Sequence, residues 1–157
     1  MPKISALIYT HNDALRIGRT LDSLRPCDEV LIIDSASEDD TQRIAREHGA
    51  VVRQAILGVE PGAYAIDTHH EWVLCLCPGE ALSEGMEASL REWQQGQPDQ
   101  DAPGYCFPVR ENVAGAWETA PAEMRLVNRN QVEWTGPLPP NAQRAIPLPG
   151  DLLKFRD

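Results

Sequence analysis

Two neighbouring stretches decide the fold of this chain: ISALIYTHNDALRIGRTLDSL, residues 4–24, and DEVLIIDSASEDDTQRIAREHGA, residues 28–50. The first begins with the apolar run Ile4–Tyr9, which predicts a buried strand. Asn12 or Asp13 can then cap a helix, because the next apolar residues recur at helical spacing as Ala14, Ile17, Leu21 and Leu24. A strand followed by an amphipathic helix is therefore predicted for residues 4–24.

The second stretch repeats this order. Val30–Ile33 is a continuous apolar run ending in Asp34, which is typical of a strand covered on both faces. Ser37 is placed to cap the next helix, whose inner stripe is Thr41, Ile44, Ala45 and His48. Gly49 ends this helix, and Ala50–Gln54 predicts a third strand. Two successive strand–helix–strand units predict the α/β class: a Rossmann-like, mostly parallel sheet with helices on both faces.

The rest of the chain predicts shorter elements. They are a short helix over Ala63–His69, a strand over Trp72–Cys77, a helix through Leu82, Met86, Leu90 and Trp93 that Ser83 can cap, and strands over Tyr105–Val109, Met124–Asn128 and Val132–Trp134. Residues 137–149 include five prolines, which favour irregular structure. We therefore expect one domain over residues 1–136 and a proline-rich arm or tail over residues 137–157.

Composition excludes several classes of protein. The chain has 157 residues with 24 acidic and 14 basic side chains, so it should not bind nucleic acid. No run of 18 apolar residues predicts a membrane span, and the first residues do not form a secretory signal. Four cysteines without a CxxC pair favour reduced thiols. These features predict a cytoplasmic protein.

The two strand ends carry a recognisable pattern. The run Thr10-His11-Asn12 and the pattern Asp34-Ser35-x-Ser37-x-Asp39-x-Thr41 resemble the opening of a family 2 glycosyltransferase with a GT-A fold, close to the type that builds lipopolysaccharide cores. In that family, these strand tips hold the base and ribose of a nucleotide-sugar donor. The resemblance implies a donor site made by Thr10, Asn12, Asp34, Ser35 and Asp39. Ligands of open α/β sheets also lie beyond the carboxyl ends of strands. Alternatively, Asp34 and Ser37 only organise a turn and cap a helix.

The resemblance also reaches Cys77-Pro78-Gly79-Glu80, where the family carries Asp-x-Asp. Those carboxylates normally hold a divalent cation such as Mn²⁺ or Mg²⁺ against the donor diphosphate. Cys77 and Gly79 supply no hard oxygen ligand, so the motif is degenerate and no metal cofactor is expected; Glu80 alone would be a weak site. Residues 54–109 hold nine acids and one base, Arg91, so no basic substitute for the metal is expected there either.

Other residues have competing interpretations. Cys75 and Cys77 follow His69 and His70 and could bind zinc, but their spacing matches no common zinc motif. Cys75 is better explained as a core residue, and Cys77, where the strand ends, is the better candidate for a reactive thiol, although no basic neighbour in the sequence would lower its pKa. Arg125 and Arg129 could contact phosphate, but on an edge strand and turn they should pair with surface acids. His11 follows the first strand and could contact a ligand, but a loop histidine without a partner in the sequence is better explained as solvated.

The sequence thus predicts a glycosyltransferase-like domain related to enzymes that use nucleotide sugars, with its metal site lost. The alternative is a catalytically inactive binding or regulatory protein, whose partner is another protein or a second copy. No residue is identified as a catalytic base.

Overall fold

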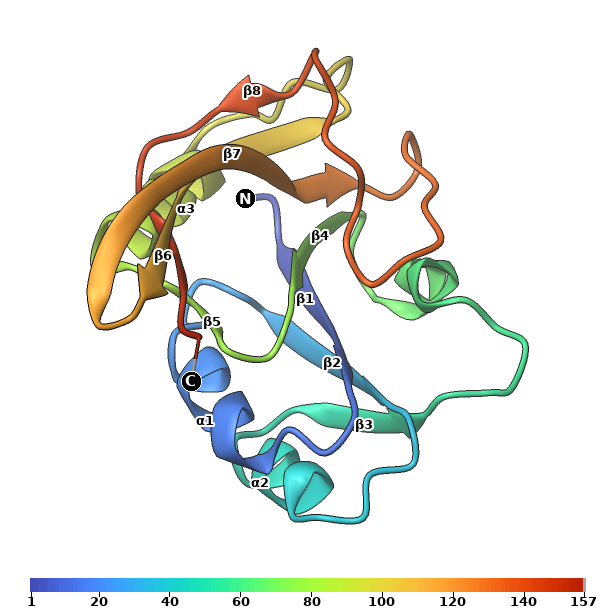
Figure 1. Cartoon of the computed structure of the whole chain (residues 1–157). Coiled ribbons are helices and arrows are strands. Elements are labelled where there is room, and N and C mark those ends of the chain that lie inside the picture. The colour runs from blue at the N-terminus through green and yellow to red at the C-terminus, as the bar shows by residue number, and fades with distance from the viewer. Residues whose placement is uncertain (157) are drawn as a thin grey trace.

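The computed structural model describes residues 1–156, and its core is one continuous mixed sheet. In chain order the elements are β1 (Ile4–Thr10), α1 (Ala14–Asp22), β2 (Glu29–Asp34), α2 (Thr41–Glu47), β3 (Val51–Gln54), the 3₁₀ helix η1 (Pro61–Asp67), β4 (Trp72–Leu76), β5 (Glu80–Leu82), α3 (Glu84–Gln95), β6 (Gly104–Val113), β7 (Ala116–Asn128), β8 (Ile146–Pro147) and β9 (Leu152–Lys154). The strand order is β3-β2-β1-β4-β7-β6-β9-β5, and β8 pairs with β6 (Figure 1).

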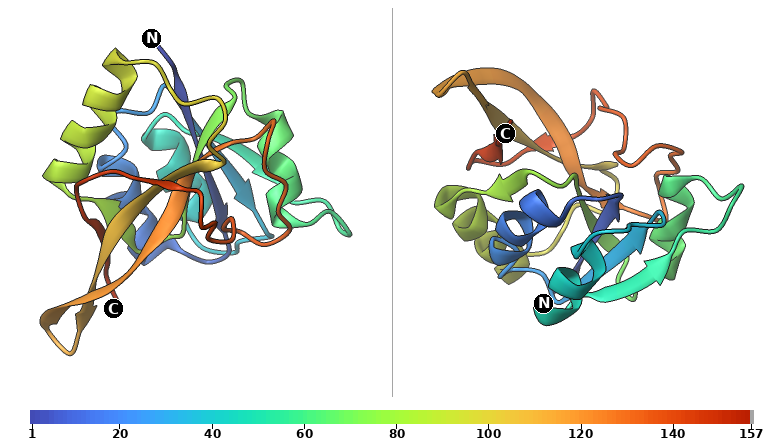
Figure 2. Two further views of the ribbon diagram at one scale, coloured as in Figure 1. Left: turned by 90° about the horizontal axis from the view of Figure 1, so that it is seen from above. Right: turned by 60° about the horizontal axis from the view of Figure 1, so that its bottom comes forward.

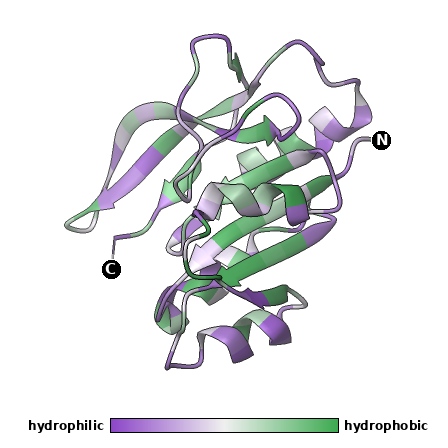
Figure 3. Ribbon diagram, turned by 90° about the vertical axis from the view of Figure 1, so that its right-hand side faces the viewer, coloured by the Kyte–Doolittle hydropathy of each residue, from purple (hydrophilic) through white to green (hydrophobic). Residues whose placement is uncertain are grey.

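The first half of the sheet is parallel. β1 pairs in parallel with β2 on one side and β4 on the other, and β2 pairs in parallel with β3. Alternate residues of these strands face opposite sides, so both faces are apolar (Figure 3). Ile4, Ala6 and Ile8 face one hydrophobic cluster, whereas Leu7 faces the other. This explains why the sequence shows continuous apolar runs here.

Helices cover the two faces unequally. Side chains of α1, α2 and α3 pack into the cluster that contains Ile8, whereas Tyr64 and Ala65 of η1 pack into the cluster that contains Leu7. The segment 132–145 completes the cover on the η1 side. The predicted α/β class with a Rossmann-like sheet is confirmed. Within residues 1–156, no helix has the length and apolar character needed to cross a membrane.

The second half of the sheet is built around a long antiparallel hairpin, β6–β7, which extends away from the parallel half (Figure 2). β7 pairs antiparallel with β4 and so joins the two halves. Within the proline-rich segment 137–157, β8 and β9 each pair in parallel with β6, and β9 also pairs with β5. Leu152 of β9 is fully buried in the main core.

Several local predictions were wrong: Leu82, for example, lies in β5 and not in the helix predicted through it. Val132–Trp134 is not a strand, because this segment packs on η1: Gly62 N donates to Thr135 O, and a Cβ on Gly62 would lie 2.0 Å from Trp134 O. Ser37 does not cap α2, which begins at Thr41, because its hydroxyl is bound to Asp34. Asp13 occupies the N-cap position of α1 but makes no side-chain cap hydrogen bond. In contrast, Ser83 caps α3 as predicted, accepting from Met86 N at 3.1 Å.

Candidate functional site

The carboxyl ends of β1 and β2 meet in a hydrogen-bonded cluster centred on Asp34. Thr10 and Asp34 are register partners in the parallel sheet, so their side chains end at the same edge. Thr10 Oγ1 donates to Asp34 Oδ1 at 2.6 Å, and Ser35 N donates to Thr10 O at 2.8 Å. Asn12 N donates to Ser37 Oγ, and Ala14 N donates to Asp39 Oδ2. The structure therefore brings together all five residues predicted for the donor site.

Asp34 is the organising residue of this cluster. Its side chain is fully buried, and it accepts four hydrogen bonds: from Thr10 and Ser37 hydroxyls, Ser37 N and Gln42 Nε2. Burial by itself would raise the pKa of Asp34, but these hydrogen bonds outweigh it and hold the pKa below its ordinary value. The carboxylate is therefore ionised and already saturated by protein donors.

The outer layer of the cluster is open to solvent. Asn12 and Asp39 are exposed and Ser35 is half-buried, whereas Thr10 is buried behind them. Asn12 adopts a positive φ of 51°, and its side-chain oxygen accepts from Glu38 N at 2.8 Å, which ties the two loops together. His11 is exposed as predicted, and its Nδ1 contacts the Ser35 carbonyl. Asn12, Ser35 and Asp39 are thus the groups that a ligand at this edge can reach.

Residues 77–80, which the resemblance aligns with the family's Asp-x-Asp motif, lie at the end of β4 and the start of β5. Glu80 is buried and is gripped by Arg125 of β7, with Nη1–Oε1 at 2.6 Å and Nη2–Oε2 at 2.7 Å. Cys77 N also donates to Glu80 Oε1 at 2.8 Å. Both oxygens of the one carboxylate in the motif are therefore engaged by the protein.

Further charges from distant parts of the chain join this pair. Glu123 accepts from Arg125 at 2.8 Å and from Lys154 of β9 at 2.6 Å. Lys154 Nζ also lies 3.9 Å from carboxylate oxygens of Glu80 and Glu111. Although burial would lower the pKa of Arg125, Glu80 and Glu123 raise it above its ordinary value. Arg125 and Lys154 thus form a buried ion-pair network with these glutamates.

This network corrects two expectations. Arg125 does pair with acids, but it is 1% exposed on a strand in the interior of the sheet, between β4 and β6, and not on an edge. Residues 54–109 do contain one base only, yet β7 and β9 bring cations to the motif from outside that range. The sequence carried little signal for this, because the partners lie 45 or more positions apart.

Gly79 lies in the turn between β4 and β5. Its φ of +89° lies in the region that favours glycine, and Phe155 N donates to its carbonyl at 2.8 Å. A Cβ at this position would lie 3.2 Å from Phe155 O and 3.5 Å from Arg16 Cδ. The space that a side chain at residue 79 would need is therefore bordered by α1 and by the segment after β9.

The cysteines do not assemble a metal site. Cys75 is fully buried in β4, while His69 is paired with Glu29 at 2.6 Å (Nδ1–Oε2). Among residues 1–156, no group of three or more histidine, cysteine, aspartate or glutamate side chains is placed to hold a metal ion. Burial and the charge of Glu80 raise the pKa of Cys77 to about 11, although Arg125 and Lys154 oppose this. The thiol of Cys77 is therefore protonated at neutral pH.

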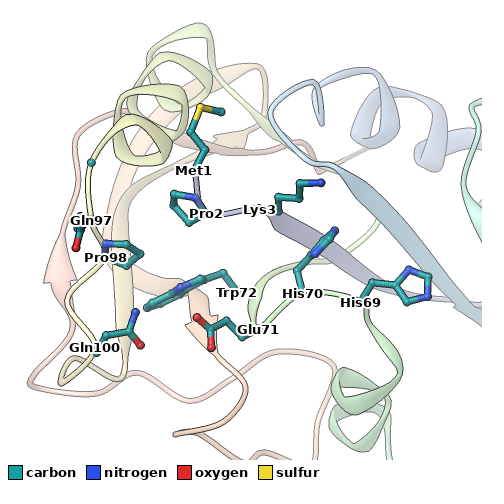
Figure 4. A pocket seen from close by; sticks show the side chains of 11 residues that line it. Met1, Pro2, Lys3, His69, His70, Glu71, Trp72, Gln97, Pro98 and Gln100 are labelled. Atoms are coloured by element: carbon teal, nitrogen blue, oxygen red, sulfur yellow. The ribbon is translucent and has the colours of Figure 1, made fainter.

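Two cavities lie away from this edge. One, of about 470 Å³, opens where β1 and β4 begin and is lined by Lys3, His70, Trp72 and Pro98 (Figure 4). Another, of about 610 Å³, lies between η1 and residues 129–135. At its border Arg129 Nη1 donates to the carbonyls of Ala65, Ile66 and Thr68, so Arg129 holds η1 in place instead of pairing with a surface acid.

Comparison with protein families agrees with the geometry of the first half of the chain. Residues 5–56 match the family model described as Glycosyl transferase family 2. An uncharacterized glycosyltransferase of Rickettsia felis is 40% identical over 94 residues, covering 57% of this chain and 33% of that protein. One from Rickettsia conorii is 39% identical over 92 residues, covering 56% and 33%. The match thus spans about a third of the length of these curated relatives.

Solved structures share the fold at low sequence identity. A mycobacterial protein aligns with a TM-score of 0.65 and 14% identity, over 99% of this chain and 68% of that one. Staphylococcus aureus TarS, residues 1–349, aligns with a TM-score of 0.57 and 18% identity, over 76% of this chain and 38% of that one. These similarities show a common GT-A-type architecture.

Proposed function

We propose that this chain, whose opening segment matches family 2 glycosyltransferases, binds the nucleoside part of a nucleotide sugar at the carboxyl ends of β1 and β2 without a divalent metal. The observation that carries this proposal is the convergence of Thr10, Asn12, Asp34, Ser35 and Asp39 in one cluster at that edge. TarS has been crystallised with UDP, which makes uridine nucleotides the first ligands to test.

Asp34 supports nucleoside binding as a positioning residue. Its four internal hydrogen bonds hold the loops that follow β1 and β2 in fixed relation. In this arrangement Asn12, Ser35 and Asp39 are presented to solvent, where amide, hydroxyl and carboxylate groups can bond to base and ribose. The direct contacts then come from these exposed residues, and Asp34 shapes the site behind them.

The motif at residues 77–80 does not fit a metal-dependent donor site. Hard divalent cations need several oxygen ligands, and the single carboxylate here is held by Arg125 and Cys77 N. The protonated thiol of Cys77 is not a ligand for such ions. Nucleotide binding should therefore be independent of Mn²⁺ and of chelators.

Calorimetric titration with UDP and UDP-glucose, in Mn²⁺ and in EDTA, tests the proposal. We expect saturable binding with the same affinity in both buffers. Glycine at position 12 tolerates the positive φ but lacks the side-chain amide, so Asn12→Gly should weaken binding. Asn130 follows the end of β7, which lies beside the start of β4 and away from the carboxyl ends of β1 and β2. Asn130→Gly should therefore leave binding unchanged. Binding that requires Mn²⁺, or no binding of any nucleotide across a panel, would contradict the proposal.

A second candidate function is that of a non-catalytic binding or regulatory protein. The saturation of Asp34 favours it, because this carboxylate has no remaining acceptor position for a ribose hydroxyl. Sugar transfer, measured by release of UDP from UDP-glucose, distinguishes such a protein from a transferase that uses the same nucleoside site. Binding without transfer across a panel of acceptors supports a non-catalytic role, and UDP release that depends on the acceptor supports an enzyme.

A further inference from the structure

Arg16 connects the two halves of the proposed site. It lies in the first turn of α1, directly after the loop that contains Asn12. Its guanidinium forms an ion pair with Asp13, whose other oxygen accepts from His11 N at 2.8 Å. Its stem lies against the Gly79 turn, with Cδ 3.5 Å from the position of a Cβ on Gly79. Arg16 therefore spans from the nucleoside cluster to the degenerate motif.

The geometry relates Arg16 to the missing carboxylate at residue 79. Two atoms lie within 4 Å of the position that a Cβ on residue 79 would take: Phe155 O and Arg16 Cδ. Of these, only the Arg16 atom belongs to α1. The Arg16 stem thus lies beside the residue that the resemblance aligns with the second carboxylate of the family's motif. Its guanidinium, paired with Asp13, places a cation between the cluster and residues 77–80.

Arg16 is exposed, and the glutamates around residues 77–80 pair with other cations. Glu80, Glu111 and Glu123 are already neutralised by Arg125, Lys154 and Arg156. Arg19, one turn further along α1, lies over the Phe155 ring, with its Cζ 3.9 Å from the ring centroid. The Arg16 side chain is 47% exposed, so an anion can reach it.

We propose that Arg16 binds the diphosphate of the nucleotide and supplies the positive charge that a metal ion supplies in related enzymes. This inference rests on the proposed nucleoside site. A guanidinium suits the task, because its fork of N–H donors matches phosphate oxygens and its charge does not depend on pH. On binding, Arg16 exchanges Asp13 for a phosphate oxygen, or bonds both through different nitrogens.

Arg43 serves as the control for a purely structural role of Arg16. Arg43 of α2 also pairs with the N-cap aspartate three positions before it, and its side chain is 58% exposed, although Asp40 is exposed and Asp13 is buried. It also pairs with Glu47 and lies on the helix that follows the Asp34 loop. If Arg16 served only to pair with an N-cap aspartate, Arg16→Gln and Arg43→Gln would behave alike.

The test compares UDP with uridine, which lacks the phosphates. Calorimetric titrations of the wild type, Arg16→Gln and Arg43→Gln should show that only Arg16→Gln weakens UDP binding, by about tenfold or more, as for loss of a bond between charged groups. Uridine affinity should remain within about twofold in all three. Arg16→Lys, which keeps the charge, should lose less UDP affinity than Arg16→Gln. Thermal unfolding of each variant verifies that it is folded.

The outcomes separate this inference from the proposed function. Equal UDP affinity in the wild type and Arg16→Gln would overturn the role of Arg16 and leave the nucleoside site standing. Equal losses of UDP and uridine affinity would also overturn it, because the effect would then not concern phosphate. A wild type that binds neither UDP nor uridine would overturn both proposals.

Discussion

Asp34 shows how a single carboxylate can organise the end of a parallel sheet. It is fully buried, yet it remains ionised because two hydroxyls, one amide and one backbone N–H donate to it. Three of these donors come from the chain segment that follows β2, and the fourth comes from the end of β1. The residue therefore links two loops that backbone pairing alone would leave separate.

Replacing Asp34 with asparagine should destabilise the fold. The asparagine side chain has the shape of aspartate, but its NH₂ group faces hydrogen-bond donors that the Asp34 carboxylate accepts. Some of these buried donors are then left unpaired, at a cost of about 1–3 kcal/mol. Because the folded pKa of Asp34 is lowered, its ionisation contributes stability above the unfolded pKa, and this is lost as pH falls through the folded value. Urea unfolding at pH 7 and at pH 3 should show a larger difference between wild type and variant at pH 7.

Asp22→Asn is the control for that measurement. Asp22 is exposed at the end of α1, and its change should alter stability by no more than about 0.5 kcal/mol. If Asp34→Asn matched this control, the hydrogen-bonded carboxylate would not be the organising group.

The thiols should react slowly in the folded protein. Burial raises the pKa of Cys75 to about 12 and that of Cys77 to about 11, so thiolate is scarce at neutral pH. Iodoacetamide labelling at pH 7.5, followed by mass spectrometry, should modify both residues far more slowly than in urea-unfolded protein. Rapid native labelling of Cys77 would show that its surroundings are more open or more cationic than the structure indicates.

At the scale of elements, a charge network joins strands that are distant in sequence. The network joins three strands through ion pairs among Glu80 of β5, Glu123 and Arg125 of β7, and Lys154 of β9. Buried ion pairs of this kind add little net stability compared with apolar residues, but removing one partner leaves an uncompensated charge. We expect the network to contribute mainly to which strands associate and in which register.

A double-mutant cycle on Glu80 and Arg125 should reveal this coupling. Arg125→Met alone should reduce the free energy of unfolding by about 3–5 kcal/mol, because buried Glu80 loses its bidentate partner and keeps only Cys77 N and the more distant Lys154. Combining it with Glu80→Gln should recover part of that loss. Arg43→Met, at an exposed pair, should cost no more than about 1 kcal/mol. Additive losses in the double variant would contradict a coupled pair.

At the scale of the whole molecule, residues from both ends of the chain build one core. β9 lies between β6 and β5, and Leu152 shares a hydrophobic cluster with Ile4 and Ile8 of β1. The proline-rich segment before β9 returns the chain to the sheet, where β8 pairs with β6. The parallel and antiparallel halves should consequently unfold together.

Leu152→Ala tests whether the two halves of the sheet unfold in one transition. Truncating this fully buried side chain should cost about 2–5 kcal/mol, and fluorescence and circular dichroism should still report one coincident transition. Leu153→Ala, at the half-buried neighbouring position, should cost less. Separate transitions by the two probes would show that the halves are independent units.

The sequence by itself determined the parallel half of the fold and the residues gathered at its edge. β1, β2 and β4 are buried on both faces, so their apolar runs were visible, and Thr10 and Asp34 stand where those runs end. Three features became visible only in the folded chain: Asp34 is saturated, Arg125 and Lys154 approach Glu80, and Arg16 lies beside Gly79. The reason is physical: hydrophobic periodicity is a local signal, whereas ion pairs between residues 45 or more positions apart depend on which strands become neighbours.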